Sequence, residues 1–267
     1  MKNVLVLMHD DAGQEARFQA ALDLTRALDG HLTCVDVAVL PVFVGDSTEF
    51  ASSALLMADE RQREGTNATR MRARLEAEDV PFTWRDENGF LTPCVRDAAG
   101  LADVIVLNRE LDDIKYPDMF ALVGDLVLKT GKPVLAVPAA AERFDAYGPA
   151  LIAWDGSSQC ETALRAAVPL LVHASSVTIV EIDDGSLKVP ATEAAAYLSR
   201  HGIAAIIRQE NSMFDVPSTV ILDTIEAVGA AYLVMGGFGH SRFVEATLGG
   251  VTRRMLKECP VPLFLAH

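Results

Sequence analysis

Apolar and polar positions alternate in blocks along the whole chain. Short apolar runs, such as residues 4–8 and 150–154, are typical of strands that are buried on both faces of a parallel sheet. Between such runs lie longer segments in which apolar residues return every three or four positions, and residues 14–28 are an example. That spacing is typical of a helix with one buried face. The pattern therefore predicts strands that alternate with helices.

The same order of elements occurs twice. Strand, helix and strand are expected at 4–8, 14–28 and 31–37, and again at 150–154, 160–171 and 177–181. The last two strands of each half also correspond, with 102–107 and 132–137 matching 231–236 and 261–266. Each half reads β-α-β-α-β-α-β-α-β, which predicts a parallel sheet with right-handed crossovers and helices on both faces.

We therefore predict an α/β fold made of two tandem five-stranded parallel-sheet α/β sandwiches. Residues 1–140 form the first domain and 148–267 the second, and a small polar stretch at 139–149 joins them. The first half is longer, mainly because of a charged helix expected at about 51–78. Because Arg63, Glu64 and many other charges lie along it, we expect this helix to be largely exposed to solvent.

Composition and charge narrow the classes of partner. Half of the 267 residues are apolar and only 6% are aromatic, as expected for a core of aliphatic side chains. The net charge of −14 repels phosphate backbones, which argues against a nucleic-acid partner. A pocket for one nucleotide is still compatible with this negative charge, because backbone amides and a helix end attract an anion locally. Apolar runs are too short for a membrane span or a signal peptide, so we expect a soluble cytoplasmic protein.

Cysteine and histidine give no sign of a special site. The four cysteines lie far apart without a C-x-x-C pair and are expected to be ordinary reduced thiols. The six histidines are scattered, and none forms H-x-x-x-H. We therefore predict neither a disulfide nor a metal site. We find no nucleophile paired with a base in the sequence, and we therefore predict no catalytic residue.

Glycines in the second half predict a phosphate site. In open α/β sheets, ligands bind beyond the carboxyl ends of the strands. There, Gly236 and Gly239 form a G-x-x-G after the fourth strand, and Gly249 and Gly250 stand where the last helix should begin. Glycine lets a ligand approach the backbone amides, and a helix start favours an anion. The Thr252 hydroxyl would add a further donor.

This arrangement resembles the ATP-binding signature of the universal stress protein family. The resemblance covers both halves, but only the second carries the full signature. It implies a Rossmann-like sandwich of the adenine nucleotide α-hydrolase type that binds ATP or AMP, with or without Mg²⁺. It places Asp155 beside the adenine and implies a binding site made of Ala153, Trp154, Asp155, Met235, Gly236, Gly239, Gly249, Gly250, Val251 and Thr252.

The sequence departs from the family pattern in two places. Gly250 stands where the family usually has Ser or Thr, which removes one hydroxyl donor worth roughly 1 kcal/mol. In the first half, His9 occupies the position of Asp155, and residues 108–111 (Asn-Arg-Glu-Leu) replace the glycine loop. We expect the first half to be structural, regulatory or suited to a ligand without phosphate. Arg253 flanks the phosphate site of the second half. Its guanidinium either pairs with phosphate oxygens or is an ordinary solvent-exposed group, and the sequence leaves both alternatives open.

The leading hypothesis is a stress-response protein that binds ATP or AMP in its second domain. It would act as a nucleotide-dependent sensor or regulator with at most slow hydrolysis. The alternatives are an adenylating or pyrophosphate-releasing enzyme of the related α/β superfamily and an interaction module that binds no nucleotide. G-x-x-x-x-G-K-[ST] and G-x-G-x-x-G are absent, which argues against a P-loop kinase and a dinucleotide dehydrogenase. The family resemblance also implies that the two halves pair as a pseudo-dimer through their last strands, and it leaves a further homodimer open.

Overall fold

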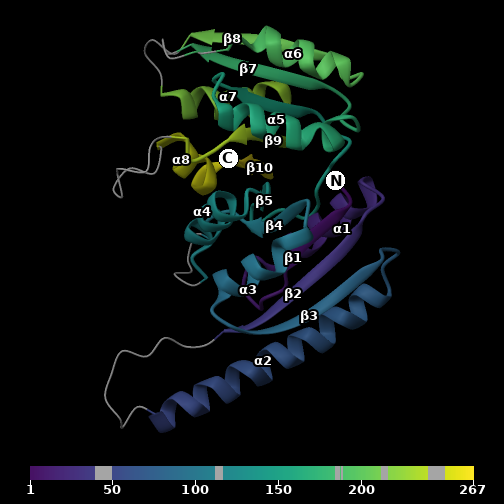
Figure 1. Cartoon of the computed structure of the whole chain (residues 1–267), viewed down its shortest axis with the longest axis vertical. Helices are drawn as coiled ribbons and strands as arrows, with labels where there is room; N and C mark the ends of the chain where they lie inside the picture. The colour runs from purple at the N-terminus through teal and green to yellow at the C-terminus, as the bar shows by residue number, and fades with distance from the viewer. Residues whose placement is uncertain (40–49, 112–116, 184–186, 188, 212–215, 240–249) are drawn as a thin grey trace.

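The computed structural model describes residues 1–39, 50–111, 117–183, 187, 189–211, 216–239 and 250–267. Its two halves follow one another along the long axis of the molecule (Figure 1). The N-terminal half consists of β1 (Asn3–Leu7), α1 (Gln14–Ala27), β2 (His31–Val39), α2 (Phe50–Glu76), β3 (Phe82–Gly89), α3 (Leu91–Ala98), the short 3₁₀ helix η2 (Ala99–Leu101), β4 (Val104–Asn108), α4 (Met119–Thr130) and β5 (Val134–Val137).

The C-terminal half repeats this order of strands and helices. It consists of β6 (Ala150–Trp154), α5 (Ser158–Leu171), β7 (Val177–Asp183), α6 (Ala191–Arg200), β8 (Ala205–Asn211), α7 (Pro217–Val228), β9 (Tyr232–Gly236), α8 (Gly250–Glu258) and β10 (Leu263–Ala266). The repeated α/β order predicted from the apolar pattern is therefore confirmed.

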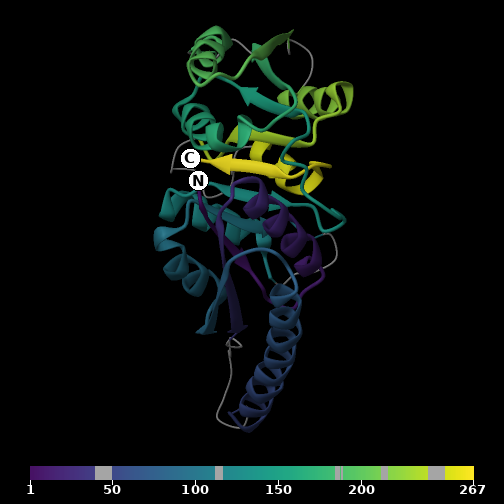
Figure 2. The same ribbon diagram turned by 90° about the vertical axis from the view of Figure 1, so that its right-hand side faces the viewer.

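All ten strands form one sheet, in the order β3-β2-β1-β4-β5-β10-β9-β6-β7-β8. The strands are parallel within each half, and the two halves meet where β5 pairs with β10 in the antiparallel direction, for example at Leu135 and Phe264. The view in Figure 2 shows these two strands crossing the middle of the molecule, with the termini nearby. Two sandwiches are thus present, but they share one continuous sheet.

The sheet has a helical layer on each face. Alternate residues of β1 show this directly, because Val4 and Val6 belong to one buried cluster and Leu5 and Leu7 to the other. The first cluster includes side chains from α1, α2, α5 and α6, and the second includes side chains from α3, α4, α7 and α8. Both clusters extend through both halves, so the strands are buried on both faces as the apolar runs predicted.

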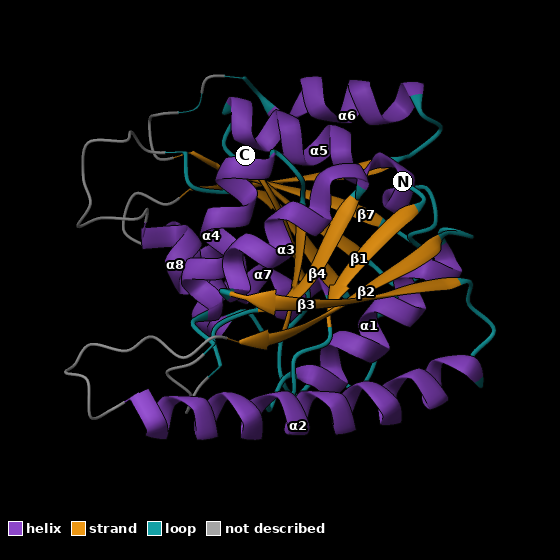
Figure 3. Ribbon diagram, turned by 60° about the horizontal axis from the view of Figure 1, so that its bottom comes forward, coloured by secondary structure: helices purple, strands orange, loops and turns teal. Residues whose placement is uncertain are grey.

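Helix α2 corrects one expectation. It packs against β2 and extends along the N-terminal half (Figure 3), and Met71 and Leu75 on its inner face are fully buried. Glu64 lies on the same inner face and is only 2% exposed, so counting it among solvent-facing charges was wrong. The helical period explains the error, because residues 64, 68, 71 and 75 recur on one side of the helix.

The linker between the halves packs against both of them. The Phe144 ring is buried and lies 5.5 Å, centroid to centroid, from the Tyr232 ring of β9. Its backbone amide donates a hydrogen bond to Asp23 of α1, so this residue touches both halves. Among the described helices, none has the length and apolarity that crossing a membrane requires.

Candidate functional site

A cavity of about 270 Å³ opens at the carboxyl ends of β6 and β9. Residues 153–155 follow one strand into it, residues 235–239 follow the other, and the first residues of α8 close a third side. This is the edge at which open α/β sheets bind ligands. The volume is close to the lower end of small-molecule sites, which run from about 300 to 1,000 Å³.

The loop after β6 holds an ionised carboxylate at the mouth of the cavity. Asp155 is exposed, and its Oδ1 accepts a hydrogen bond of 2.9 Å from the Ser157 amide. Burial of part of the carboxyl raises its pKa, but hydrogen bonds from the Cys160 thiol and from Ser157 outweigh this effect and lower it. Asp155 is therefore an acceptor, suited to an N–H or O–H of a ligand.

The turn that carries Asp155 is fixed by its neighbours. Gly156 has φ +69°, and a Cβ there would meet the backbone of Val189 at 2.4 Å. The Trp154 indole donates to the Val189 carbonyl at 2.8 Å. Ser157 caps α5 by accepting from the Cys160 amide at 3.3 Å. These contacts within the protein are sufficient to hold the loop after β6 in one conformation.

Gly236 serves packing more than exposure of its amide. A Cβ on this residue would lie 2.5 Å from the Cys160 nitrogen and 2.6 Å from the Gln159 carbonyl carbon, so only glycine lets β9 approach the start of α5. We predicted from the sequence that this glycine lets a ligand approach, but its close contact with the backbone of α5 is by itself a sufficient reason for a glycine here. Gly239 differs, because its nearest neighbour is the flexible end of the Gln159 side chain at 3.2 Å.

Two amides of the glycine loop already have partners. The Gly237 amide donates to the Ala266 carbonyl at 2.9 Å, and the Phe238 amide donates to the Thr252 hydroxyl at 3.4 Å. Phe238 has a positive φ of 60°, which is uncommon outside glycine. Thr252 therefore ties the loop to α8, and its own hydroxyl proton can still be donated to a ligand.

The start of α8 offers further donors. The first amides of a helix have no acceptor within the helix, and the helix dipole favours an anion at this end. Within the part of the chain that the structure describes, a Cβ on Gly250 would meet no atom within 4 Å. Arg253 is not among the residues that line the cavity, and its guanidinium lies over the Phe120 ring of α4, 5.5 Å from the centroid.

The cavity brings together nearly all of the residues that the sequence singled out. Those that line it are Ala153, Trp154, Asp155, Met235, Gly236, Gly239, Gly250, Val251 and Thr252. Gly249 lies outside the described residues. Sequence reasoning missed Gln159, Cys160, Ile182, Pro217 and Ile221, which also line the cavity. The apolar ones among these carry no distinguishing signal, since in the sequence they look like ordinary core positions of β7 and α7.

The chemistry of the lining favours binding over reaction. Burial and the Asp155 charge raise the pKa of the Cys160 thiol to about 12, which keeps it protonated and a poor nucleophile at neutral pH. Among the described residues that line the cavity, Asp155 is the only carboxylate. One carboxylate does not make a dedicated magnesium site, and Mg²⁺ is commonly held together with substrate phosphates.

Comparison with known proteins agrees with this architecture. The model of the universal stress protein family matches residues 146–267. A universal stress protein of Synechocystis sp., Slr1230, is 26% identical over 199 residues, which are 66% of this chain. The aligned region spans 62% of that relative's length. The C-terminal half of the chain is therefore similar to the universal stress protein family.

Solved universal stress proteins share the fold over the whole chain. One from Archaeoglobus fulgidus has a TM-score of 0.74 at 16% identity, and the alignment covers 98% of this chain and 97% of that one. A putative universal stress protein from Pseudomonas aeruginosa has a TM-score of 0.60 at 16% identity, covering 100% and 93%. The N-terminal half, which the family model does not match, therefore has the universal stress protein fold as well.

The corresponding edge of the N-terminal half is built from different groups. Val4 pairs with Val104 as Ala150 pairs with Tyr232, so Asn108 at the end of β4 stands where Gly236 ends β9. Arg17 of α1 is fully buried there. Its guanidinium donates to the Leu7 and His9 carbonyls, to Asp11 and to Asn108. In this half, an internal cation satisfies the polar groups at the strand ends.

Proposed function

We propose that the C-terminal half binds ATP or AMP in the cavity between β6, β9 and α8. The protein would act as a nucleotide-dependent sensor or regulator with at most slow hydrolysis. One observation carries the proposal: residues from three separate segments, which the sequence signature links to nucleotide binding, line a single cavity. Mg²⁺ would enter with the nucleotide phosphates.

The lining of the cavity suits both parts of a nucleotide. Apolar side chains from several elements, including Ala153, Ile182 and Met235, offer a surface for the flat adenine ring, and Asp155 is an acceptor in the same lining. The lining also includes Gly239 and the amide-rich start of α8, where an anion is favoured. A phosphorylated adenine nucleotide matches both kinds of group at once.

Calorimetry with ATP, ADP and AMP on the full chain tests the proposal. We expect one site per chain, and Asp155→Ala should weaken binding at least tenfold because an acceptor facing the ligand is lost (about 1.4 kcal/mol or more). Asp223→Ala is the matched control, since Asp223 is an exposed carboxylate on the neighbouring helix α7. Absence of binding tighter than about 1 mM for all three nucleotides would overturn the proposal.

A parallel assay of the products addresses the reaction class. Incubation with ATP and Mg²⁺ should release phosphate slowly or not at all, because the Cys160 thiol is held protonated and is a poor nucleophile. Rapid release of pyrophosphate would instead support the adenylating enzyme and would contradict a role limited to sensing.

A further inference from the structure

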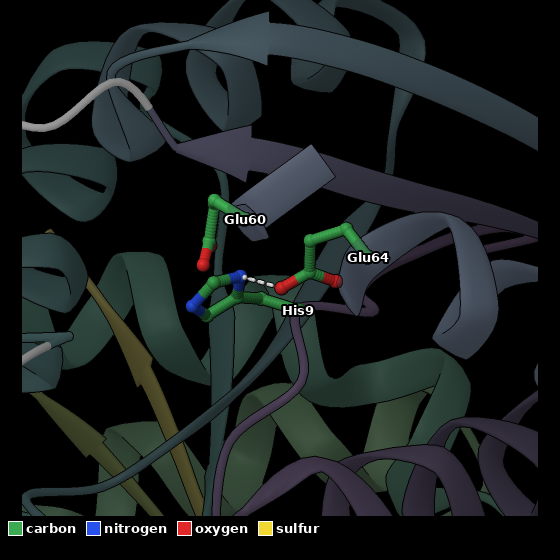
Figure 4. A group of neighbouring side chains, drawn as sticks. All are labelled: His9, Glu60 and Glu64. Carbon is green, nitrogen blue, oxygen red and sulfur yellow. Dashed lines mark ion pairs between the residues drawn. The ribbon is translucent and has the colours of Figure 1, made fainter. Parts of the chain in front are cut away.

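Three metal-ligating side chains meet in the N-terminal half. His9 follows β1, and Glu60 and Glu64 lie one turn apart on α2, so that one ligand atom from each lies within 4.8 Å of the others. Figure 4 shows both carboxylates directed toward the imidazole of His9. The cluster occupies the position at which the C-terminal half carries Asp155, and it lies apart from the nucleotide cavity.

The innermost pair is tightly held. The Nδ1 of His9 lies 2.7 Å from Oε1 of Glu64, and both side chains are at most 3% exposed. The Asp10 amide donates to Oε1 of Glu64 at 3.2 Å, and the Asn67 amide group donates to Oε2 at 3.4 Å. These bonds orient the carboxylate toward His9 from the inside. Glu60 is partly exposed, with 21% of its side chain accessible, so the cluster opens to solvent on that side.

A further buried carboxyl stands behind the pair. Asp36 of β2 is 4% exposed and neighbours Glu64, and its Oδ1 receives no hydrogen bond from the residues that the structure describes. This carboxyl adds a buried polar atom next to Glu64, in a site largely closed to water. The two glutamate carboxylates beside the imidazole form a negatively charged set that a bound cation would neutralise.

The nearest basic side chain lies at the surface. The Arg63 guanidinium is 3.0 Å from Glu60 and 3.7 Å from Glu64, and half of its side chain is exposed. Arg72 acts on Asp36 from the other side, where it also pairs with the exposed Asp86. Because Arg63 is long and half-exposed, it can swing into solvent and leave both glutamates to another cation.

We propose that His9, Glu60 and Glu64 bind a divalent transition-metal ion of the zinc class. The Nδ1 of His9 and one oxygen of each glutamate would be the protein ligands, and water would complete the coordination from the open side near Glu60. Asp36 would support Glu64 from behind. This proposal does not depend on nucleotide binding in the other half.

The donor set determines the class of metal. One imidazole nitrogen with two carboxylates suits zinc and related transition metals, whereas calcium and magnesium prefer oxygen ligands alone. Around tetrahedral zinc, ligand atoms lie roughly 3.3 Å apart, given metal–ligand distances of about 2.0 Å. The ligand atoms of His9 and Glu64 are already this close, so bringing all three ligands around one metal ion requires mainly a movement of the partly exposed Glu60.

Zinc calorimetry on the full chain, stripped with EDTA and without nucleotide, tests the site. We expect one Zn²⁺ per chain, bound more tightly than about 10 µM. Glu60→Gln should weaken binding at least tenfold, because it removes a ligand from the open side without disturbing the buried pair. Glu76→Gln is the matched control, an exposed glutamate at the far end of α2, and should bind as the unaltered protein does.

Arg63→Gln should change the affinity for zinc in the opposite direction to Glu60→Gln. If Arg63 competes with the metal for the two glutamates, its removal should tighten zinc binding several-fold, whereas loss of a merely structural ion pair would not. Because Glu60 and Arg63 are partly exposed, both variants should fold, and circular dichroism checks this. Absence of stoichiometric zinc binding, or affinities that neither variant changes, would overturn the proposal and leave His9 and Glu64 as a buried ion pair only.

Discussion

In each half the end of the fourth strand packs on the start of the first helix, and the two halves place the glycine that this contact needs on opposite elements. In the C-terminal half the strand β9 ends in glycine, and Gln159 stands on the facing helix start. In the N-terminal half β4 ends in Asn108, and the facing residue is Gly13, where a Cβ would lie 2.2 Å from the Asn108 side chain. Each half therefore keeps one glycine at the crossing of strand and helix, but on the opposite element.

This exchange accompanies a difference in chemistry. The C-terminal edge is an open cavity, lined by the acceptor Asp155 and by the start of α8. At the N-terminal edge, Arg17 binds the strand-end carbonyls, Asp11 and Asn108, and His9 turns instead toward α2. The same frame of strands thus leaves a cavity open in one half and holds a buried polar network around Arg17 in the other.

The largest expected effect comes from Arg17→Met. This change removes a fully buried cation and leaves Asp11 and Asn108 without their donor, so we expect a loss of about 3–5 kcal/mol in the free energy of unfolding. Urea denaturation measures it. Arg165→Met, on the exposed face of α5, is the matched control and should change stability by less than about 0.5 kcal/mol. Similar stability for both variants would contradict the role assigned to Arg17.

The glycine exchange predicts the next effect. Gly13→Ala and Gly236→Ala should each lower the free energy of unfolding by about 1–3 kcal/mol, since their new methyl groups meet a hydrogen-bonded buried side chain and a backbone, respectively. Gly239→Ala should be milder, because the flexible Gln159 side chain can move away. Thermal unfolding compares the three, and a Gly239 variant as unstable as the other two would refute this distinction.

Gly250→Ser should sharpen the difference between the halves by improving the C-terminal site. A Cβ at this position meets no atom of the described residues within 4 Å, and a hydroxyl there would add one donor for phosphate, which we expect to tighten ATP binding about fivefold to tenfold (~1 kcal/mol). Gly250→Ala supplies the same Cβ without the hydroxyl and should give no such gain. Calorimetry distinguishes them, and equal affinities would mean that phosphate does not approach this side of α8.

The smallest effect concerns the ion pair that joins α1 to the long helix α2. Arg74 lowers the pKa of Glu15 to about 2, although both side chains are well exposed. Because this pKa is lower when folded than the usual 4.5, the stabilisation is present above about pH 4.5 and is lost as the pH falls toward 2. Glu15→Gln should cost less than about 1 kcal/mol at pH 7 and nothing near pH 2, as measured by urea denaturation at both pH values.

Local patterns were enough to predict the repeat, and together with the family resemblance they predicted most of the cavity lining. Apolar runs and helical spacing depend on near neighbours in the chain, and the glycines of the signature lie at strand and helix ends that these patterns locate. The β5–β10 pairing was anticipated only from the resemblance, because nothing local to Leu135 or Phe264 specifies which strand lies beside it.

Features that depend on contacts between distant segments were missed. The sequence gives no sign that Gly236 packs on Cys160, and Glu64 looks like any other charge of α2 until the fold places it against His9. The same is true of Ile182 and Ile221, whose place in the cavity depends on how β7 and α7 lie beside β9. Such residues follow from the packing of the whole sheet, not from the order of residues along one element.

The seam between β5 and β10 has a consequence for how the halves stay associated. Because both strands belong to one polypeptide, they meet at an effective concentration set by the connecting chain, and dilution does not separate them. The pairing also covers an edge of each half, so the sheet presents only β3 and β8 at its two ends. Two unlike halves, one with an open cavity and one with an internal network, are thereby always matched one to one.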